Sequence, residues 1–410
     1  MLQSIGRSIL NGLVALLLAG TFLFPYVGGA ATAYALIAVS LILIVWNFAR
    51  PPRFAFDPGS WMFLIAWAMI AIAFAITNLP DRTDFLLAVN FAMWALYPLL
   101  AGALQRFAGP RNSERVAIFA LFGTFFAFAI AAFQVFVQNF PRAQGYGSNP
   151  IPSATAAMFL GFFALLGLFA FRNRWRYVFL LGPVAGIGTV LLAGSRGPFL
   201  ALPALGLIAL IMAPVKRVYS FGLAAILVLG AGAAYLVKPA AFGRFAALPR
   251  IVFDLLTGHP VDTSVDFSGG VRYAILQGSL AAFERSPWLG YGWYMKIQVV
   301  EKYMPWDVGF GNPRTGHLHS DILNIGVSAG IVGLIAYALV ILAPIAAAAA
   351  SPRDSQFRGR LFLALSLSAG FLCCGAVNLL FGFEFMTTMY VCFAAIFIGY
   401  CRDTPAVAAR

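Results

Sequence analysis

The sequence predicts an all-α polytopic membrane protein with about 12 transmembrane helices and one long, partly helical outer loop. The 410-residue chain is 61% hydrophobic and only 10% charged, and its mean hydropathy is +0.88. Apolar runs recur along it, and a run of about 20 residues crosses the hydrocarbon core as a helix. This composition excludes a soluble globular domain. The four cysteines lack the spacing of a zinc or redox site, so we interpret them as small core residues.

The apolar windows place each predicted span to within a few residues. Most windows are separated by short segments that contain arginine, proline or glycine, which are typical of membrane-protein loops. The predicted spans are 8–27, 31–49, 61–77, 84–104, 115–138, 152–171, 177–194, 197–213, 219–237, 319–348, 359–379 and 384–401. An even number of spans places both termini on one side of the membrane.

The distribution of basic residues predicts which side that is. Of the 27 basic residues, 16 lie at the termini or in every second loop, whereas the other short loops hold only Arg82, Arg142 and Arg196. Lysine and arginine collect on cytoplasmic loops, so both termini are predicted to be cytoplasmic. The net charge of +13 is therefore a topology signal, and no basic stripe interleaved with aromatic residues suggests nucleic-acid binding.

The remaining basic residues fall in one long outer loop. We divide the chain into nine spans over 1–237, the loop over 238–318, and three spans with the C-terminus over 319–410. Within the loop, the spacing of Tyr273, Leu276, Leu280 and Phe283 predicts a helix over 272–284 that packs on the membrane surface. We expect Gly269 and Gly270 to break the chain before this helix. A structural cap over the bundle is an equally valid interpretation of this segment.

Two arginines on the outer side follow glycine and stand where a helix begins. Arg196 lies in the minimal turn "GSRGP", where Pro198 suits the first turn of the next helix. Arg272 follows Gly269 and Gly270 at the start of the predicted loop helix. A guanidinium beside a helix N-terminus forms an anion site, although snorkelling to lipid headgroups or simple surface exposure would also explain either arginine.

Two of the chain's three histidines stand at the mouth of the tenth predicted span, in "GHLHSDILNIG". Ser320 or Asp321 can cap this helix. The positive end of the helix dipole disfavours imidazolium, so a histidine here tends to be neutral and able to accept a proton. The alternative is a histidine that only caps the helix. No cysteine or carboxylate cluster completes a zinc site with His317 and His319.

These segments, in this order, resemble the O-antigen ligase family, which shares a core region with O-antigen polymerases and bacterial O-oligosaccharyltransferases. The resemblance lies in "GSRG" opening a span, "RYAIL…SPWLGYG" in the long loop, and "HSDILNIGVSAGIVG" entering the next span. It covers roughly residues 140–335. By matching position, the family's functional residues correspond to Arg196, Arg272 and His319. His317 is an additional histidine two residues earlier.

The resemblance implies a GT-C-like glycosyltransferase in the bacterial inner membrane, with its active site facing the periplasm. It implies transfer of O-antigen glycan from undecaprenyl diphosphate to a sugar hydroxyl of lipid A–core, with His319 as general base and Arg196 and Arg272 binding the diphosphate. Arg142, Tyr273, His317 and Asp321 are further candidates for the site wall, although for the segment that contains Arg142 we favour a simple connector. Polymerase, protein-directed transferase and lipid-linked oligosaccharide flippase remain as alternatives.

We expect neither a metal ion nor another cofactor. Many lipid-phosphate glycosyltransferases hold a divalent metal with acidic residues, but the first outer loop, "YVGGA", has no carboxylate and the chain has no D-x-D motif. Two arginines can neutralise the diphosphate instead, because each can form two parallel hydrogen bonds to phosphate oxygens.

Overall fold

The computed structural model describes residues 2–25, 29–49, 53–77, 88–147, 149–214, 267–305 and 316–403, and these ranges contain helices and no strand. The α-helices are α1 (Leu2–Phe22), α2 (Ala30–Phe48), α3 (Pro58–Thr77), α5 (Ala92–Leu104), α6 (Asn112–Ala132), α7 (Pro150–Ala164), α8 (Gly167–Ala170), α9 (Leu181–Ala193), α10 (Leu202–Met212), α14 (Phe267–Arg285), α15 (Lys296–Glu301), α16 (Asp321–Ala350), α17 (Phe357–Gly375) and α18 (Glu384–Ala395). Short 3-10 helices are η1 (Ala88–Phe91), η2 (Gln105–Phe107), η4 (Arg174–Leu180) and η5 (Gly197–Ala201), and π-helices are η3 (Phe133–Val137) and η6 (Ile396–Tyr400).

The described helices agree with most of the predicted spans. Eight helical segments are long and apolar enough to cross a membrane, and three shorter apolar ones, Ser8–Phe22, Gly197–Met212 and Glu384–Tyr400, coincide with further predicted spans. The ninth predicted span, 219–237, lies outside the described residues. The all-helical, multi-pass class is therefore confirmed, while the count of 12 and the GT-C-like architecture stay predictions.

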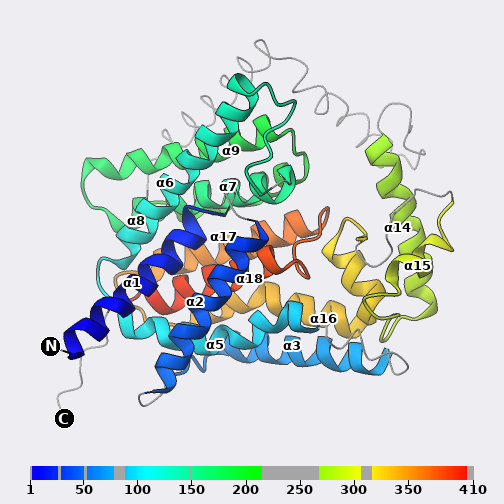
Figure 1. Cartoon of the computed structure of the whole chain (residues 1–410), viewed down its shortest axis with the longest axis horizontal. Helices are drawn as coiled ribbons and strands as arrows, with labels where there is room; N and C mark the ends of the chain where they lie inside the picture. The colour runs from blue at the N-terminus through cyan, green and yellow to red at the C-terminus, as the bar shows by residue number, and fades with distance from the viewer. Residues whose placement is uncertain are drawn as a thin grey trace.

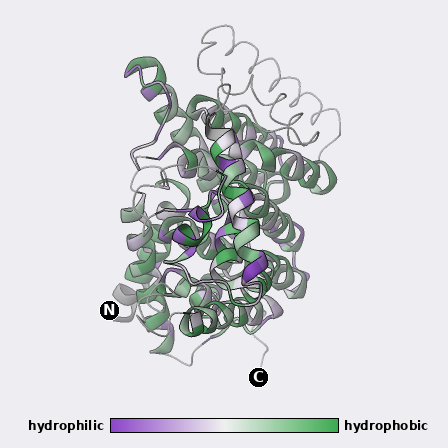
Figure 2. Ribbon diagram, turned by 90° about the vertical axis from the view of Figure 1, so that its right-hand side faces the viewer, coloured by the Kyte–Doolittle hydropathy of each residue, from purple (hydrophilic) through white to green (hydrophobic). Residues whose placement is uncertain are grey.

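The helices run roughly along the long axis of the molecule and form a bundle. Figure 1 shows α6 to α9 on one side of the bundle, α3, α5 and α16 on the other, and α17 and α18 between them. The helices α14 and α15 stand together at one end. Hydrophobic residues dominate the ribbon of the described helices, as Figure 2 shows. Such a distribution is expected of a membrane-spanning bundle, in which apolar side chains fill the core and also cover the outer surface that contacts lipid.

Small residues bring helices into close contact where they cross. Gly161 of α7 and Gly182 of α9 face each other so closely that a side-chain carbon on either would lie 2.6 Å from the other's carbonyl oxygen. Gly59, near the start of α3, lies in the same way against the backbone of α16 at Ala343. Lipid tails are as apolar as leucine, so such van der Waals packing, rather than removal of apolar surface from water, stabilises helix pairs in a membrane.

The bundle has two chemically different ends. One end, which we call the histidine end, carries His317 and His319, just before the first residue of α16. At this end the ring of Phe91 packs on that of Trp293, with 5.6 Å between the ring centroids. The opposite end, which we call the arginine end, carries Arg53, Arg106 and Arg115 near Leu10 of α1 and Tyr400 of η6. There α3 begins beside the last turns of α16, and Figure 1 shows the start of α1 at the same end. Residues 331–350 of α16 alone span about 30 Å at 1.5 Å per residue. The two ends are therefore separated by roughly the thickness of a hydrocarbon core.

The helix α16 is interrupted near its beginning, where the sequence predicted a continuous span over 319–348. Gly330 adopts φ 60° and ψ −151°, which no helix contains. The backbone groups released by this break bond to the segment that follows α14: the N–H of Ile331 donates to the carbonyl of Pro287 at 2.7 Å, and the carbonyl of Val327 accepts from the N–H of Tyr291 at 2.9 Å. The break thus fastens the loop helices to α16.

The prediction that two glycines break the chain before the loop helix was wrong. The helix α14 begins at Phe267 and contains both Gly269 and Gly270, so the predicted helix 272–284 is present but starts earlier. Glycine in a helix interior costs about 1 kcal/mol relative to alanine, a weak preference that tertiary packing overrides. The buried face of α14 contains Ile275 and Ala282, which form a small core with Val300 of α15. Of the predicted apolar face, Leu276 and Leu280 are exposed, and Tyr273 and Phe283 are half-buried.

Candidate functional site

His319 lies in a strained backbone conformation directly before α16. Its φ is +52°, in the left-handed region that costs a side-chain-bearing residue about 1–2 kcal/mol. Its backbone N–H donates to Nδ1 of His317 at 3.2 Å, and the two rings meet edge to face with 4.2 Å between centroids. The His317 ring also packs against Phe383, at 5.8 Å between centroids. Strain that the surroundings maintain at one place is typical of a functional site.

Buried amide groups hold this histidine loop in place. Asn324, one turn into α16, accepts the backbone N–H of Leu318 at 3.1 Å and donates from its side chain to the carbonyl of Ser320 at 2.6 Å. Ser320 is the N-cap of α16, and its hydroxyl accepts from the N–H of Leu323 at 3.4 Å, as the capping pattern predicted. The loop is therefore fixed on both sides of His319.

Asp321 connects the histidine loop to the segment between α17 and α18. Its side chain is fully buried, and its Oδ1 accepts from the backbone N–H groups of Leu380 at 2.7 Å and Phe381 at 3.0 Å. The N–H of Asp321 donates to the carbonyl of Asn378 at 3.1 Å. The sequence suggested Asp321 as a wall of the site. In the structure its buried carboxylate and its backbone N–H attach the start of α16 to the segment 378–381.

The Arg196 turn rests on the same segment. The helix α9 ends in a left-handed Gly194, and Arg196 precedes η5 with Pro198 in its first turn, as predicted. Gly197 lies against the side-chain amide of Asn378, and a side-chain carbon there would collide with it. This glycine therefore lets the side chain of Asn378 approach the backbone of the turn. Arg196 and His319 are therefore seated on one short segment, 378–381.

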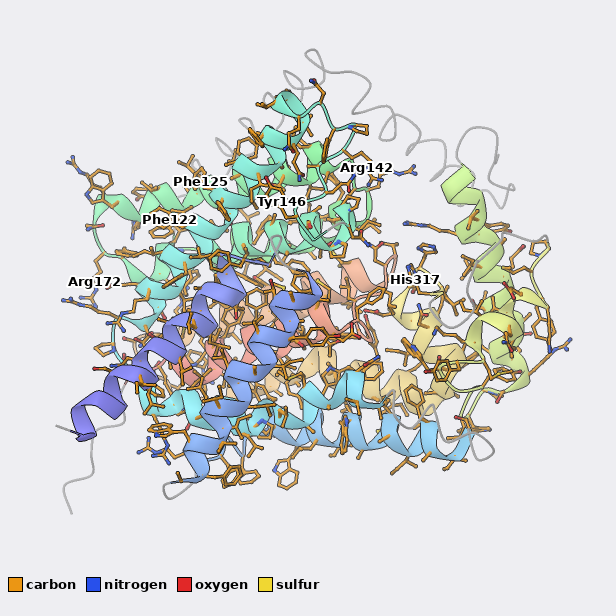
Figure 3. All side chains as sticks on the ribbon, viewed as in Figure 1. Phe122, Phe125, Arg142, Tyr146, Arg172 and His317 are labelled. Atoms are coloured by element: carbon orange, nitrogen blue, oxygen red, sulfur yellow. The ribbon has the colours of Figure 1, made fainter. Side chains whose placement is uncertain are left out.

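Arg142 is bound to the turn that carries Arg196. Its Nε donates to the carbonyl of Ala193 at 2.8 Å, and its terminal nitrogen lies 3.5 Å from the carbonyl of Gly194 and 3.4 Å from Oγ of Ser195. A guanidinium at the C-terminus of α9 satisfies carbonyls that the helix leaves open and suits the negative end of its dipole. Figure 3 shows Arg142 on the upper group of helices and His317 below it, toward α14.

Arg272 approaches the histidines from α14. It lies in the second turn of that helix rather than at its N-terminus, and it is partly buried. The next residue, Tyr273, accepts a hydrogen bond from Gln277 on the same helix at 3.1 Å. This hydrogen bond of Tyr273 runs along α14.

The electrostatic environment keeps both imidazoles neutral. Burial, followed by the nearby cations of Lys296 and Arg272, lowers the pKa of His317 to about 4. Burial, the His317 ring and the Arg272 guanidinium lower the pKa of His319 to about 3. Loss of hydration and like charge both disfavour imidazolium. The positive charge of Arg272 therefore acts on both histidines.

Residues 181–338 match the O-antigen ligase family. The matched segment is less than half of the chain, and it contains the Arg196 turn, α14, α15 and the histidine loop. No curated protein matches the chain. The match confirms the resemblance drawn from the sequence and indicates a membrane glycosyltransferase of the O-antigen ligase or polymerase type.

A buried lysine that was not predicted from the sequence lies within the segment that matches the O-antigen ligase family. Lys296, at the start of α15, is only 1% exposed. Its Nζ donates to the backbone carbonyl of Trp293 at 2.9 Å and lies 3.9 Å from the centroid of the Trp293 ring. Trp293 in turn packs on Gly382, one residue before Phe383. The signal that could have found it is a lysine within the largely apolar run "YMKIQVV", because a lysine that is buried there needs a partner.

The aromatic residues of the ligase-like loop have separate tasks. Tyr291 donates its hydroxyl hydrogen to the carbonyl of Ala282 at 3.1 Å, and Trp293 is buried against Phe91. Trp288 is 69% exposed. Of these three aromatic rings, only that of Trp288 presents most of its surface to a ligand.

No group of three or more His, Cys, Asp or Glu residues that could hold a metal ion occurs in the described part of the chain.

Proposed function

We propose that this protein transfers O-antigen glycan from undecaprenyl diphosphate to a sugar hydroxyl of lipid A–core at the periplasmic face of the bacterial inner membrane. The O-antigen ligase match supports the class of enzyme, and the grouping of Arg272 with two neutral histidines supports the chemistry. In this orientation the histidine end faces the periplasm, and the arginine end, with both termini, faces the cytoplasm.

His319 acts as the general base, and the hydrogen-bonding state of the two histidine rings is the observation that carries the proposal. The His317 Nδ1 already accepts a hydrogen bond, which places the proton of that neutral ring on Nε2 and leaves it no acceptor. No hydrogen bond within the described part of the chain engages a ring nitrogen of His319. A neutral imidazole with an open nitrogen can take the proton of an acceptor hydroxyl, which typically contributes 10²–10⁴-fold to rate.

Arg196 and Arg272 bind the donor diphosphate from two sides. They come from different elements, the α9–η5 turn and α14, so their guanidinium planes can address different phosphate oxygens. The leaving group is a lipid diphosphate whose charge must be stabilised as the anomeric bond breaks. Arg142 supports this arrangement by holding the turn that carries Arg196. Attack by the acceptor hydroxyl opposite the diphosphate, in one displacement, inverts the anomeric centre.

Donor binding strengthens the base. In the free protein the cation of Arg272 helps to hold the pKa of His319 near 3, which is too low for an efficient base at neutral pH. A bound diphosphate brings negative charge next to that cation and favours imidazolium, so the pKa of His319 rises toward the working pH. The acceptor hydroxyl is therefore activated only when there is a donor to attack.

O-antigen polymerase and protein O-oligosaccharyltransferase use the same donor chemistry and differ in the acceptor. A lipid-linked oligosaccharide flippase is a different class, and it needs charged groups deep within its spans to form a path. The described spans carry their charged residues in the first or last turn, which favours a one-sided enzyme.

One experiment separates these functions. Purified protein is incubated with undecaprenyl-diphosphate-linked glycan together with lipid A–core, pilin, or further donor alone. Glycosylated lipid A–core supports the ligase, glycosylated pilin supports the protein-directed transferase, and a lengthened lipid-linked glycan supports the polymerase. Transport of donor across vesicles without any transfer product would overturn the proposal.

A further inference from the structure

Leu318, the residue between the two histidines of the site, lies in a different environment from either of them. Its side chain is 1% exposed, whereas His317 and His319 are both partly exposed. Its backbone N–H donates to Oδ1 of Asn324 at 3.1 Å, so the peptide is held by α16. The mechanism proposed above assigns no role to Leu318.

The Leu318 side chain belongs to a small hydrophobic core, which we call the loop core. This core joins α14, α15, the histidine loop and the first half of α16, and it is separate from the large core of the bundle. Its buried members are Ile275, Ala282, Ile297, Val299, Val300, Leu318 and Val327. Leu318 is thus the contribution of the histidine loop to the packing of the loop helices.

The loop core also positions Arg272 on α14. Val271, directly before this arginine, packs against the loop core, and Ile275, three residues after it, is fully buried within it. Val271 and Ile275 are four residues apart and share one face of the helix. Their packing fixes the rotation of α14 about its axis, and with it the direction of Arg272. The sequence neighbours of the proposed diphosphate ligand and of the proposed base are therefore packed in one core.

We propose that Leu318 is a positioning residue for the transfer reaction, whose packing in the loop core sets the distance between the Arg272 guanidinium and the His319 ring. This inference rests on the function proposed above. Close-packed side chains transmit a displacement, because they interdigitate with few voids. A shorter side chain at position 318 releases the histidine loop from α14, while the hydrogen bond to Asn324 keeps it attached to α16. Arg272 is then separated from the base without removal of either residue.

The charges around the two rings provide a readout of this distance. Arg272 acts on both rings from α14, Lys296 acts on His317 from α15, and the two imidazoles meet edge to face. Burial, as the largest cause, and these neighbours lower the pKa of His319 to about 3. A loosened loop core admits water and moves the Arg272 charge away. Both changes raise the pKa of His319 toward its ordinary value of about 6.5.

The first test examines His319 without any transfer reaction. Purified full-length protein is treated with diethylpyrocarbonate, which acylates neutral imidazole, and acylation of His319 is followed by mass spectrometry between pH 5 and 7. In the unaltered protein the rate constant should be level over this range, because the ring stays neutral. In Leu318→Ala it should be about tenfold lower at pH 5 than at pH 7, because the ring then titrates near pH 6.

The second test measures transfer in the same variants. Leu318→Ala should lower kcat/KM roughly 10- to 100-fold, because a misplacement of about 1 Å can cost on the order of 100-fold. Leu318→Met conserves the side-chain volume and should restore most of the activity and the level acylation rate. Leu43→Ala is the matched control, because Leu43 is equally buried but lies in α2. It should lose comparable thermal stability, keep kcat/KM within about twofold and leave the acylation rate level.

A level acylation rate in Leu318→Ala, or an equal pH response in Leu43→Ala, would overturn the proposal. So would a loss of transfer in Leu318→Met as large as that in Leu318→Ala. If Leu318→Ala does not fold, Leu318→Val tests the same shifts at smaller size. An unaltered protein that transfers no glycan, together with a pH-dependent acylation rate in Leu318→Ala, would refute the proposed function and still support the packing role of Leu318.

Discussion

The two histidines before α16 are predicted to respond very differently to substitution. His319→Ala removes the proposed base, whereas His317→Ala removes the ring that accepts the backbone N–H of His319 and packs against it. The first change should abolish transfer without weakening donor binding, because the arginines hold the diphosphate. The second should reduce transfer but preserve it, because the base itself remains.

The structure sets the expected magnitudes. Loss of a positioned general base costs on the order of 10²–10⁴-fold in rate. Loss of one hydrogen bond costs about 1 kcal/mol and loss of an aromatic ring contact about 0.5–1.5 kcal/mol, which together amount to roughly 10- to 60-fold if all of it acts on the reaction. The side chain of Asn324 also helps to keep His319 in its strained backbone conformation. We therefore expect the rate loss of His317→Ala to lie near the lower end of this range.

The assay is transfer in vitro, run beside donor-binding measurements on both alanine variants and on His259→Ala as a control. His259 lies outside the described residues and outside every motif, so its variant should retain full activity. Greater loss at His317 than at His319 would mean that the base is assigned to the wrong histidine. Equal loss of donor binding and transfer in His319→Ala would show that this residue binds or folds, and the general-base role would have to be abandoned.

The pH profile provides an independent check of the same residue. A depressed pKa keeps His319 deprotonated, so kcat/KM for the donor, which reports the free enzyme, should stay level from pH 8 to 5 and fall only as the pH approaches the range of about 3 to 4. Bound diphosphate raises this pKa, so kcat should begin to fall at a higher pH than kcat/KM does. A kcat/KM that halves near pH 6.5 would refute the burial and charge argument.

Three further predictions concern the donor site. Arg196→Lys and Arg272→Lys should each lose roughly 10- to 100-fold in kcat/KM despite keeping their charge, since a lysine cannot make two parallel hydrogen bonds to a diphosphate; near-normal turnover would mark that arginine as a surface residue. Transfer should continue in excess EDTA, and activity that EDTA abolishes and magnesium or manganese restores would exclude a mechanism based on two arginines alone. Arg142→Ala should cost about tenfold, less than either lysine variant, because it loosens the turn at Ala193 and Gly194 and does not remove a phosphate ligand; a loss as large as that of Arg196→Lys would give Arg142 a direct role.

The sequence predicts features that depend on local chemistry. Apolar length places the spans, and Pro198 with Gly194 places the Arg196 turn, because both rest on backbone preferences of a few adjacent residues. Ser320 as the N-cap follows from the same kind of local rule. The start of the loop helix failed for the complementary reason. The helical cost of Gly269 and Gly270 is small, and packing of α14 on α15 outweighs it.

The support beneath the candidate site could not be predicted, because it depends on contacts between distant residues. Asp321 accepts hydrogen bonds from the backbone N–H groups of Leu380 and Phe381, about 60 positions away. Nothing in the apolar run "NLLFGF" predicts that its backbone will bind the start of another helix. Asn378 is similar, since its importance comes from touching Gly197 across 181 positions. Polar residues within predicted spans are the available signal, because a buried amide or carboxylate in a membrane needs a partner.

The residues of the candidate site are attached to the bundle in two different ways. Arg196 and His319 share the segment 378–381 as their seat, so their relative position is built into the bundle. Arg272 is carried by α14, which is joined to α16 through backbone hydrogen bonds at the break around Gly330. A displacement of α14 would therefore change the distance from Arg272 to the histidines while leaving Arg196 in place. Arg272 depresses the pKa of His319 and is also the proposed ligand of the donor diphosphate. In the proposed mechanism, the position of this single helix therefore couples diphosphate binding to the strength of the base.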